Sequence, residues 1–420
     1  SDKCDKHIIT LSNNYGRNCS HYYAKYNDIS LSYLLESEKC CEEIITHQDN
    51  AGDNSLHIAC QYNIKSVNTL IKSKYLTNQL ILQQNMKKLN PIMTILIHNP
   101  NEAINLYKKF ITLEELILQI DNKGNNLMFY AIKYNLKLLR IILKSPYCNK
   151  QLLSVRNNNN WTCHMYASKH NGEALNFLLK HKDTDNEMLY LNHLDYESAL
   201  TIGAKYQPDA IKYLLSWKKL SWKIINALSN DNNFLSIACM YNSRAAKYAI
   251  DSDLDLTVLF DKRYNHNPFL NACRYQPDAV KYILESKYGS RQMILTKIDN
   301  RTYLDEAYDL QPKGMVNILK SKYGDTDLLN VEDERGYKLL LRIKSVFNVN
   351  TIDEISKIPL TRFDNELIDK NSKACNICLT FKQIVLFTPC HHMCCVGCSF
   401  KMKKCHQCRT LIENRIILDV

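Results

Sequence analysis

Two short segments carry the same pattern of apolar and polar positions. Residues 206–215 are YQPDAIKYLL, and residues 275–284 are YQPDAVKYIL. The apolar side chains of the first segment that share one helical face are Ala210, Ile211, Leu214 and Leu215. Pro208 suits the first turn of a helix, where its missing N–H is not needed, and Asp209 complements the positive end of the helix dipole. The pattern therefore predicts an amphipathic helix in each segment.

The pattern recurs along most of the chain. A short apolar segment precedes each copy, and a small residue stands three positions before the tyrosine, Gly203 in one case and Ala272 in the other. Sliding this pattern along the sequence gives ten anchor positions, 34–36 residues apart. The anchors are Tyr23, Ala59, Ile95, Ala131, Ala167, Gly203, Ala238, Ala272, Ala307 and Ile343. A steady period of this length is typical of proteins in which stacked helix pairs bury one continuous core. The small anchors predict places where two helices approach closely.

Tyrosine follows the anchor by three positions in six of the repeats. These tyrosines are Tyr26, Tyr62, Tyr134, Tyr206, Tyr241 and Tyr275. We interpret them as packing residues rather than as a cage for a ligand. The predicted fold is mostly α, a solenoid of about nine or ten helix pairs over residues 10–345, with one extended concave surface.

The best-formed repeat covers residues 49–71, DNAGDNSLHIACQYNIKSVNTLI. It resembles the ankyrin repeat, whose core is D-x-x-G-x-T-P-L-H-x-A. The matching residues are Asp49, Gly52, Leu56, His57 and Ala59. Asn54 and Ser55 stand where Thr and Pro are usual, and a weaker copy begins at residues 121–124. The resemblance implies an ankyrin-like array in which His57 ties down a turn by hydrogen bonds instead of acting as a catalytic base. Tetratricopeptide repeats are the alternative, but their Trp-Leu-Gly-Tyr signature is missing.

Cysteine is crowded near the C-terminus. Eight of the 17 cysteines lie between Cys375 and Cys408, and crowding of this kind in a reducing compartment suggests metal binding. The spacing C-x2-C-x11-C-x1-H-x2-C-x2-C-x6-C-x2-C supplies eight ligands, enough for two tetrahedral zinc sites. The predicted ligands are Cys375, Cys378, Cys390, His392, Cys395, Cys398, Cys405 and Cys408. We interpret Cys394 and His391 as bystanders, because using either of them would disrupt these spacings.

The spacing is similar to that of the RING finger, and we place this domain at residues 374–410. The resemblance implies a cross-brace in which the two sets of ligands are interleaved. One zinc ion is then held by Cys375, Cys378, Cys395 and Cys398, and the other by Cys390, His392, Cys405 and Cys408. A segment this short needs its zinc ions to fold. PHD fingers place the histidine later in the series, and FYVE fingers carry an arginine-rich lipid motif that is absent here.

The RING resemblance also implies a function. RING domains of ubiquitin ligases bind a charged ubiquitin-conjugating enzyme and hold its thioester in a reactive geometry, with no nucleophile of their own. The positions that would contact the conjugating enzyme are Ile377, Pro389 and Met402. Arg409 matches the linchpin that bridges enzyme and ubiquitin through its fork of donors. His406 departs from the proline that active RING domains usually carry after the seventh ligand.

Two segments flank the cluster. Residues 346–373 form a linker, with a short helix expected over residues 364–369. The apolar tail at residues 411–420, LIENRIILDV, resembles that of inhibitor-of-apoptosis ubiquitin ligases, in which the tail pairs across a RING dimer. The alternative is a tail that folds back on its own RING.

Composition narrows the remaining choices. Hydrophobic residues make up 45% of the chain and charged residues 23%, as in ordinary folded proteins. The net charge of +11 comes from scattered Lys and Arg, which favours a solvated surface over a nucleic-acid site. No apolar run approaches the roughly 18 residues of a membrane span, so we expect a cytoplasmic or nuclear protein. The whole architecture resembles ankyrin proteins of giant DNA viruses, which act inside a host cell.

The leading hypothesis is a RING-type ubiquitin ligase that transfers ubiquitin without a covalent intermediate of its own. The repeats would bind an unknown target protein, and the RING would recruit the charged conjugating enzyme. The alternative is a non-catalytic ankyrin scaffold or decoy whose RING only dimerises or sequesters partners. Zinc-dependent binding of nucleic acid is a third and weaker hypothesis.

Overall fold

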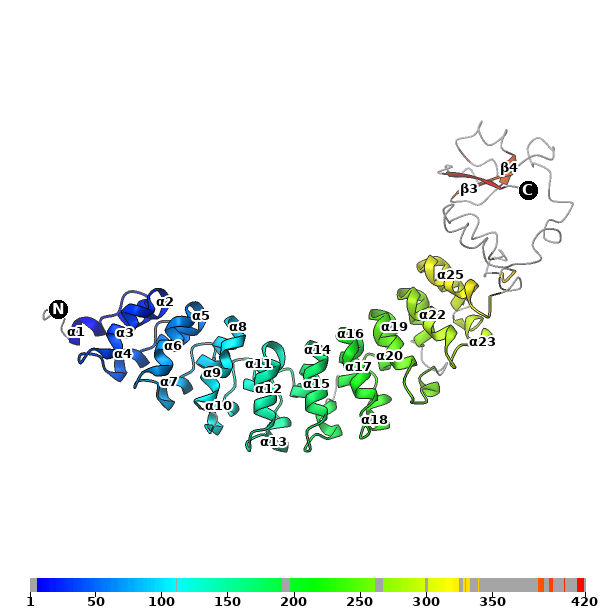
Figure 1. Cartoon of the computed structure of the whole chain (residues 1–420). Coiled ribbons are helices and arrows are strands. Elements are labelled where there is room, and N and C mark those ends of the chain that lie inside the picture. Colours follow the sequence, from blue (N-terminus) through cyan, green and yellow to red (C-terminus); the bar gives the residue numbers. More distant parts are fainter. Residues whose placement is uncertain are drawn as a thin grey trace. The chain divides into compact units, whose positions relative to one another are not determined.

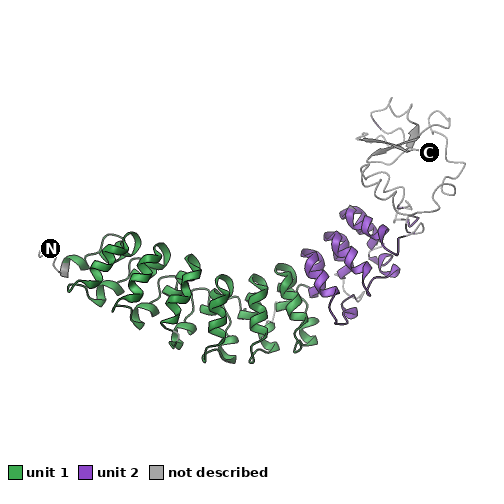
Figure 2. Ribbon diagram, in the orientation of Figure 1, with its two compact units in different colours: residues 1–230 green, residues 231–420 purple. Residues whose placement is uncertain are grey.

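The structure is a computed structural model, and it is mostly helical, as predicted (Figure 1). It describes residues 6–110, 112–190, 197–260, 267–298, 301–324, 328, 330–332, 339, 384–388, 393–395, 404 and 414–418. The chain divides into two compact units, unit 1 at residues 1–230 and unit 2 at residues 231–420 (Figure 2). Ile343, the linker at 346–373 and its expected helix at 364–369 lie outside the described residues.

A helical triplet recurs through unit 1, after the short helix α1 (Lys6–Thr10). The first helices are α2 (Cys19–Tyr26), α5 (Ser55–Tyr62), α8 (Pro91–His98), α11 (Leu127–Tyr134), α14 (Cys163–His170) and α16 (Ala199–Tyr206). The second helices are α3 (Asp28–Glu36), α6 (Ile64–Lys72), α9 (Ala103–Lys108, preceded by η1 at Pro100–Glu102), α12 (Leu136–Leu143), α15 (Gly172–Leu179) and α17 (Pro208–Leu215). A short third segment completes each triplet: α4 (Glu42–Thr46), α7 (Asn78–Leu82), α10 (Glu114–Leu118), α13 (Lys150–Leu153), η2 (Asn186–Leu189) and α18 (Trp222–Ile225). The third segment goes beyond the predicted helix pair.

Unit 2 continues the same order of elements. Its helical segments are α19 (Phe234–Tyr241), α20 (Ser243–Ile250), η3 (Thr257–Phe260), α21 (Pro268–Tyr275), α22 (Pro277–Glu285), α23 (Arg291–Ile294), α24 (Tyr303–Leu310) and α25 (Pro312–Lys320). A small antiparallel hairpin, β1 (Lys297–Ile298) and β2 (Arg301–Thr302), precedes α24. Within each unit, the first helix of one triplet packs against the first helix of the next. The described residues thus contain nine first helices, each followed by a second.

The predicted anchors fall at the fifth position of every first helix, and this confirms their register. The anchors from Ala59 to Ala307 are buried, and Ala272, the critical case, has no exposed surface. At Gly203, an added Cβ would lie 3.0 Å from the Cβ of Ala210, so the two helices of this pair do approach closely. Tyr23 is the exception, because it is 36% exposed. The position accommodates the side chain of Ile95, but the longer and polar ring of Tyr23 reaches solvent.

One residue ends each first helix and begins the second. Its backbone N–H donates to the carbonyl oxygen of the anchor over 2.7–3.0 Å in all nine described pairs. Where this residue is asparagine, its side chain can also accept from the first turn of the second helix, as Asn135 does from the N–H of Leu138. Gln207, Gln276 and Gln311 make no such bond, and each precedes a proline that has no N–H to satisfy. Asn99, which precedes Pro100, likewise makes no such bond.

A row of tight turns precedes the first helices of unit 1. The turns cover residues 13–17, 49–53, 85–89, 121–125 and 157–161, and in each the first N–H donates to the fifth carbonyl oxygen. The fourth residue has a positive φ, which glycine adopts without strain, and it is Gly16, Gly52, Lys88, Gly124 or Asn160. Each turn is joined to the preceding one by a backbone hydrogen bond, for example from the N–H of Asn158 to the carbonyl of Lys123 over 2.9 Å.

We expect Gly124→Ala to destabilise unit 1 by about 1–3 kcal/mol, the typical cost of a left-handed conformation in a residue with a side chain. A Cβ at Gly124 would also lie 2.6 Å from Oδ1 and 2.8 Å from the backbone N of Asn158. Gly314→Ala in α25 is the matched control, because its Cβ would have no contact closer than 3.5 Å and the helix would gain up to about 1 kcal/mol. Urea denaturation followed by circular dichroism measures both. Equal midpoints for the two variants would contradict the expectation.

Candidate functional site

The C-terminal candidate site contains a three-stranded antiparallel sheet. Its strands are β3 (Ile384–Thr388), β4 (Met393–Cys395) and β5 (Asn414–Leu418), in the order β4-β3-β5. In β4, the predicted ligand Cys395 is paired with Ile384, and the predicted bystander Cys394 is paired with Val385. The sheet therefore begins between the second and third predicted ligands and includes the fifth.

Most residues predicted for this site lie outside the described residues. They comprise seven of the eight ligands, the four positions taken from the RING resemblance and two histidines. They are Cys375, Cys378, Cys390, His392, Cys398, Cys405, Cys408, Ile377, Pro389, Met402, Arg409, His391 and His406. The zinc-ligand assignment, the conjugating-enzyme contacts and the linchpin accordingly stay predictions.

The apolar tail forms part of this sheet. Strand β5 pairs with β3 of the same chain, from Ile384 opposite Leu418 to Thr388 opposite Asn414. Of the two alternatives for the tail, the structure contains the one that folds back on its own module. Both edges of β3 are thereby occupied, so within the described sheet only the outer edges of β4 and β5 are open.

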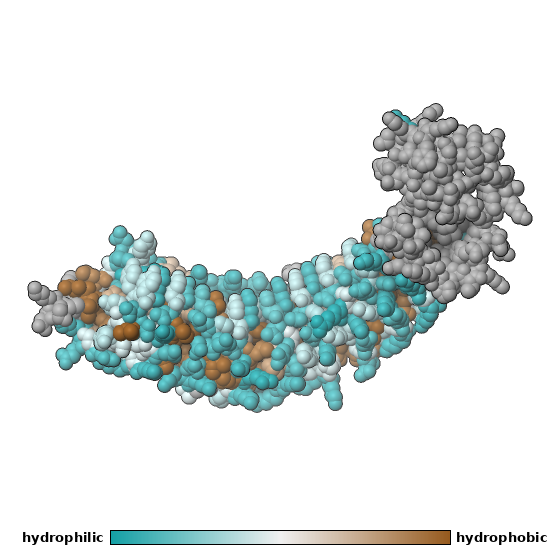
Figure 3. Space-filling view, turned by 45° about the horizontal axis from the view of Figure 1, so that its top comes forward, coloured by the Kyte–Doolittle hydropathy of each residue, from teal (hydrophilic) through white to brown (hydrophobic). Residues whose placement is uncertain are grey.

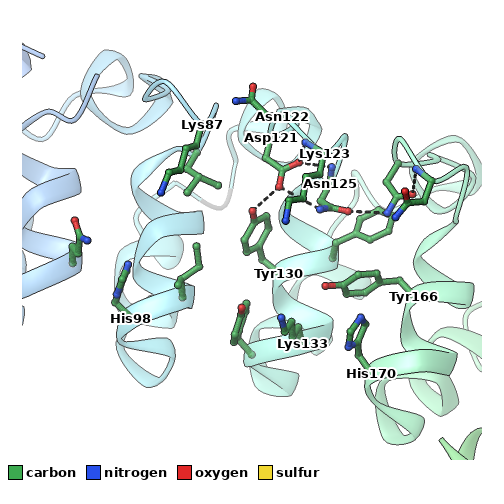
Figure 4. Close-up of a pocket in the computed structure, with 17 residues that line it drawn as sticks. Lys87, His98, Asp121, Asn122, Lys123, Asn125, Tyr130, Lys133, Tyr166 and His170 are labelled. Atoms are coloured by element: carbon green, nitrogen blue, oxygen red, sulfur yellow. Dashed lines mark hydrogen bonds between the residues drawn. The ribbon is translucent and has the colours of Figure 1, made fainter. Parts of the chain in front are cut away.

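A second candidate site is a groove of about 640 Å³ in unit 1 (Figure 4). Its turn rim consists of Lys87, Asn122, Lys123 and Asn159, and its helix rim consists of His98, Lys133, Tyr134 and His170. Side chains between the rims include the apolar residues Leu89, Ile97 and Phe129. Figure 4 shows Lys87 and Lys123 toward one side of the groove and His98, Lys133 and His170 toward the other. The sequence pattern did not identify this groove, because its lining comes from successive triplets.

The carboxylate of Asp121 is satisfied within its own triplet. Its Oδ1 accepts from the N–H groups of Lys123 and Asn125, both over 2.8 Å. Its Oδ2 accepts from the hydroxyl of Tyr130 over 2.6 Å and from Nδ2 of Asn125 over 3.2 Å. Burial, together with this bond to Asp121, raises the pKa of Tyr130, so its phenol stays protonated and donates. Asp121 therefore fixes the turn and one wall of the groove.

Five of the six recurring tyrosines are exposed. Tyr26, Tyr62, Tyr206, Tyr241 and Tyr275 are 46–68% exposed, so the prediction that they pack within the array is wrong for them, whereas Tyr134 is half-buried and stacks on Tyr130. They end the first helices, where a side chain extends beyond the buried face and keeps its hydroxyl in water. In unit 1, lysine ammonium groups lie over their rings. The distances to the ring centroid are 4.3 Å from Lys25 to Tyr62, 5.0 Å from Lys133 to Tyr134 and 4.7 Å from Lys169 to Tyr206.

The buried histidines have structural partners. His57 shares a hydrogen bond with the carbonyl oxygen of Leu89 over 2.8 Å and another with Asn54, which confirms its predicted role in tying down the next turn. Burial lowers the pKa of His57. Burial also lowers the pKa of His164, to about 3, and its ring contacts the hydroxyl of Thr184. Neutral, hydrogen-bonded rings of this kind serve the fold.

Other kinds of site find no support in the described residues. No group of three or more His, Cys, Asp or Glu in that part of the chain has the arrangement of a metal site. None of its helices is both long and apolar enough to cross a membrane.

Comparison with known protein families identifies the C-terminal module. Residues 371–415 match the family described as "Zinc finger, C3HC4 type (RING finger)". The order of the predicted ligands, three cysteines, one histidine and four cysteines, is the order that this name gives. The match confirms the predicted RING-type zinc finger. It covers a short part of the chain and does not include the helical triplets. RING fingers bind zinc, so the metal binding that the sequence suggested is assigned to residues 371–415.

Comparisons with whole proteins add little. No curated protein gives a significant match to the chain. One similar solved structure is a predatory endopeptidase from Bdellovibrio bacteriovorus in complex with an immunity protein. The matched chain has 19% sequence identity and a TM-score of 0.31, over 42% of this chain and 82% of that one. A likeness at this level carries no functional argument.

Proposed function

We propose that the protein is a RING-type ubiquitin ligase. The observation that carries the proposal is the match of residues 371–415 to the RING finger family, with its ligands in the family's order. RING fingers serve ubiquitin transfer or protein interaction, and the helical triplets supply the large surface that target recognition requires.

The zinc finger would hold two zinc ions in interleaved sites. Cys375, Cys378, Cys395 and Cys398 would hold the first, and Cys390, His392, Cys405 and Cys408 the second. Seven thiolates and one imidazole form a donor set that suits closed tetrahedral zinc and excludes the oxygen-rich sites of calcium or magnesium. In this role zinc is structural, and it supplies folding free energy to a segment with little core of its own.

Transfer would depend on orientation. Ile377, Pro389 and Met402 would form the groove that contacts the conjugating enzyme. The Arg409 guanidinium, a planar fork of donors, would bridge the enzyme to its bound ubiquitin and hold the thioester in a reactive geometry. The attacking amine comes from the target, so the RING itself contributes no nucleophile and forms no covalent intermediate.

The helical triplets would act as an ankyrin-type array that binds the target protein. The tight turns 36 residues apart, the hydrogen bond from His57 to the next turn and the buried small anchors support this assignment. The tail would pair across a dimer through the outer edge of β5, because its other edge is paired with β3. We place the protein in the cytoplasm or nucleus, where ubiquitin and its conjugating enzymes are available.

The experiment that tests the proposal is discharge of ubiquitin from a panel of charged conjugating enzymes to free lysine, with the full chain as catalyst. Faster discharge with at least one enzyme is expected. No discharge with any enzyme would overturn the ligase proposal. Binding or dimerisation without discharge would favour the scaffold alternative, which the histidine at position 406 already favours. In that case His406→Pro tests whether the missing proline is what silences the RING.

A further inference from the structure

We propose that the groove of unit 1 binds an extended acidic segment of a partner protein. The inference rests on the proposed role of the helical triplets in target binding, and it names the chemistry of the target. The groove lies wholly within unit 1, between the turn rim and the helix rim defined above. Its lining side chains come from several successive elements of unit 1, as Figure 4 shows.

The charged side chains that line the groove are mostly positive. Three lysines, Lys87, Lys123 and Lys133, line it, and all three are exposed. The one carboxylate in the lining is Asp121, which accepts four hydrogen bonds from its own triplet. Among the described residues, no ion pair joins any of the three lysines to a carboxylate. The lysines are therefore available to carboxylates of a partner, and complementary charges give such contacts their specificity.

The remaining lining suits a polypeptide. Leu89 and Ile97, both partly exposed, offer apolar surface between the rims for side chains on one face of an extended strand. Asn159 on the turn rim provides an amide group that can donate to, and accept from, a peptide backbone, and Asn122, whose amide nitrogen donates to Met86, offers its amide oxygen. On the face drawn in Figure 3, hydrophobic residues lie in separate patches among hydrophilic ones.

Single-stranded nucleic acid is the competing anionic ligand, and the aromatic rings argue against it. Such binding depends on bases stacking on open ring faces. In the groove, the ammonium group of Lys133 lies 5.0 Å from the ring centroid of Tyr134, Tyr134 stacks on Tyr130, and the ring of Tyr166 packs against His170. A base would have to displace these neighbours, whereas a carboxylate would add to the ammonium group. The geometry thus favours carboxylate groups over bases.

Fluorescence anisotropy of the full chain tests the proposal, with a labelled peptide of repeating Glu-Leu, about twelve residues long, as probe. The groove variant is Lys123→Glu/Lys133→Glu. The matched control is Lys137→Glu/Lys144→Glu, which makes the same change in net charge at exposed positions of α12 and its C-cap, away from the groove lining. We expect the wild type and the control to bind the peptide and the groove variant to bind at least about tenfold more weakly. Added salt should weaken the binding by the wild type.

Two results would overturn the proposal. One is absence of peptide binding, or equal binding by the groove variant and the control. The other is tighter binding of an oligothymidylate of about twelve nucleotides that the groove variant loses, which would make the groove a nucleic-acid site. Discharge of ubiquitin to free lysine, measured on the same variants, separates this inference from the proposed function. Discharge without peptide binding refutes the acidic partner alone, and peptide binding without discharge refutes the ligase alone.

Discussion

Chelation of zinc should unfold the C-terminal module and leave the helical triplets folded. Structural zinc contributes about 10–16 kcal/mol per site in small peptides, more than a module of this size can replace by burial. The triplets depend on their own buried apolar core. We therefore expect the far-ultraviolet circular dichroism of the chain to keep most of its helical signal after chelation. Before chelation, elemental analysis of the reduced protein should give two zinc ions per chain.

Adjacent cysteines provide the matched variants for this experiment. Cys395→Ser should lose one zinc ion and destabilise the module, because it removes a predicted ligand. Cys394→Ser should keep both ions, because we interpret this residue as a bystander. Both residues belong to β4, so a general effect on the strand would appear in both variants. Loss of zinc from Cys394→Ser alone, or a zinc content of one or none in the wild type, would refute the assignment.

Arg409→Ala should reduce ubiquitin discharge by about 100-fold, with zinc content and fold unchanged. The reason is orientation, since a misplaced reacting group can cost about 100-fold in rate. Arg409→Lys should also be impaired, because one ammonium group keeps the charge and cannot form the two-point bridge of a guanidinium. Single-turnover discharge from a saturating charged conjugating enzyme measures this effect.

Ile377→Ala distinguishes binding from orientation in the same assay. Loss of its apolar contact should weaken the affinity for the conjugating enzyme, so that higher enzyme concentrations restore the rate. Arg409→Ala should not recover in this way. Discharge by Arg409→Ala at the wild-type rate would exclude the linchpin role. A parallel change in zinc content would instead show that the substitution disturbs the module itself.

The anchors could be predicted from the sequence because a first and a second helix pack together in the same way in each repeat. A small residue allows a first and second helix to approach closely, as at Gly203, and alanine or glycine recurs at this position in seven of the nine described triplets. The zinc-binding role of the cysteine cluster could be predicted equally well, since metal ligands must be particular residues at short, fixed spacings. The match at residues 371–415 confirms the family that this spacing indicated.

Other features depend on information that no single repeat contains. In the sequence, the Asp-x-x-Gly pattern of the turns could be recognised only at Asp49–Gly52 and Asp121–Gly124. Lys88 and Asn160 occupy the left-handed position in two other turns, so the glycine signal is missing there. The asparagines between the helices would have been a better signal than the tyrosines, since their capping role is local. Exposure of the tyrosines depends on where the first helices end. The groove could not be predicted at all, because its rims are assembled from neighbouring triplets.

Backbone hydrogen bonds join successive turns of unit 1, and these joints allow the length of the binding surface of the helical triplets to change. Each joint uses the same backbone atoms, the N–H of one turn's second residue and the carbonyl of the preceding turn's third residue. A deletion of residues 86–121 would fuse Asn85 to Asn122 and create a hybrid turn with Gly124 at the left-handed position in place of Lys88. Whole periods can thus be lost or duplicated with every joint chemically intact. Recombination between repeats would shorten or extend the binding surface in single steps and leave the zinc finger at its end untouched.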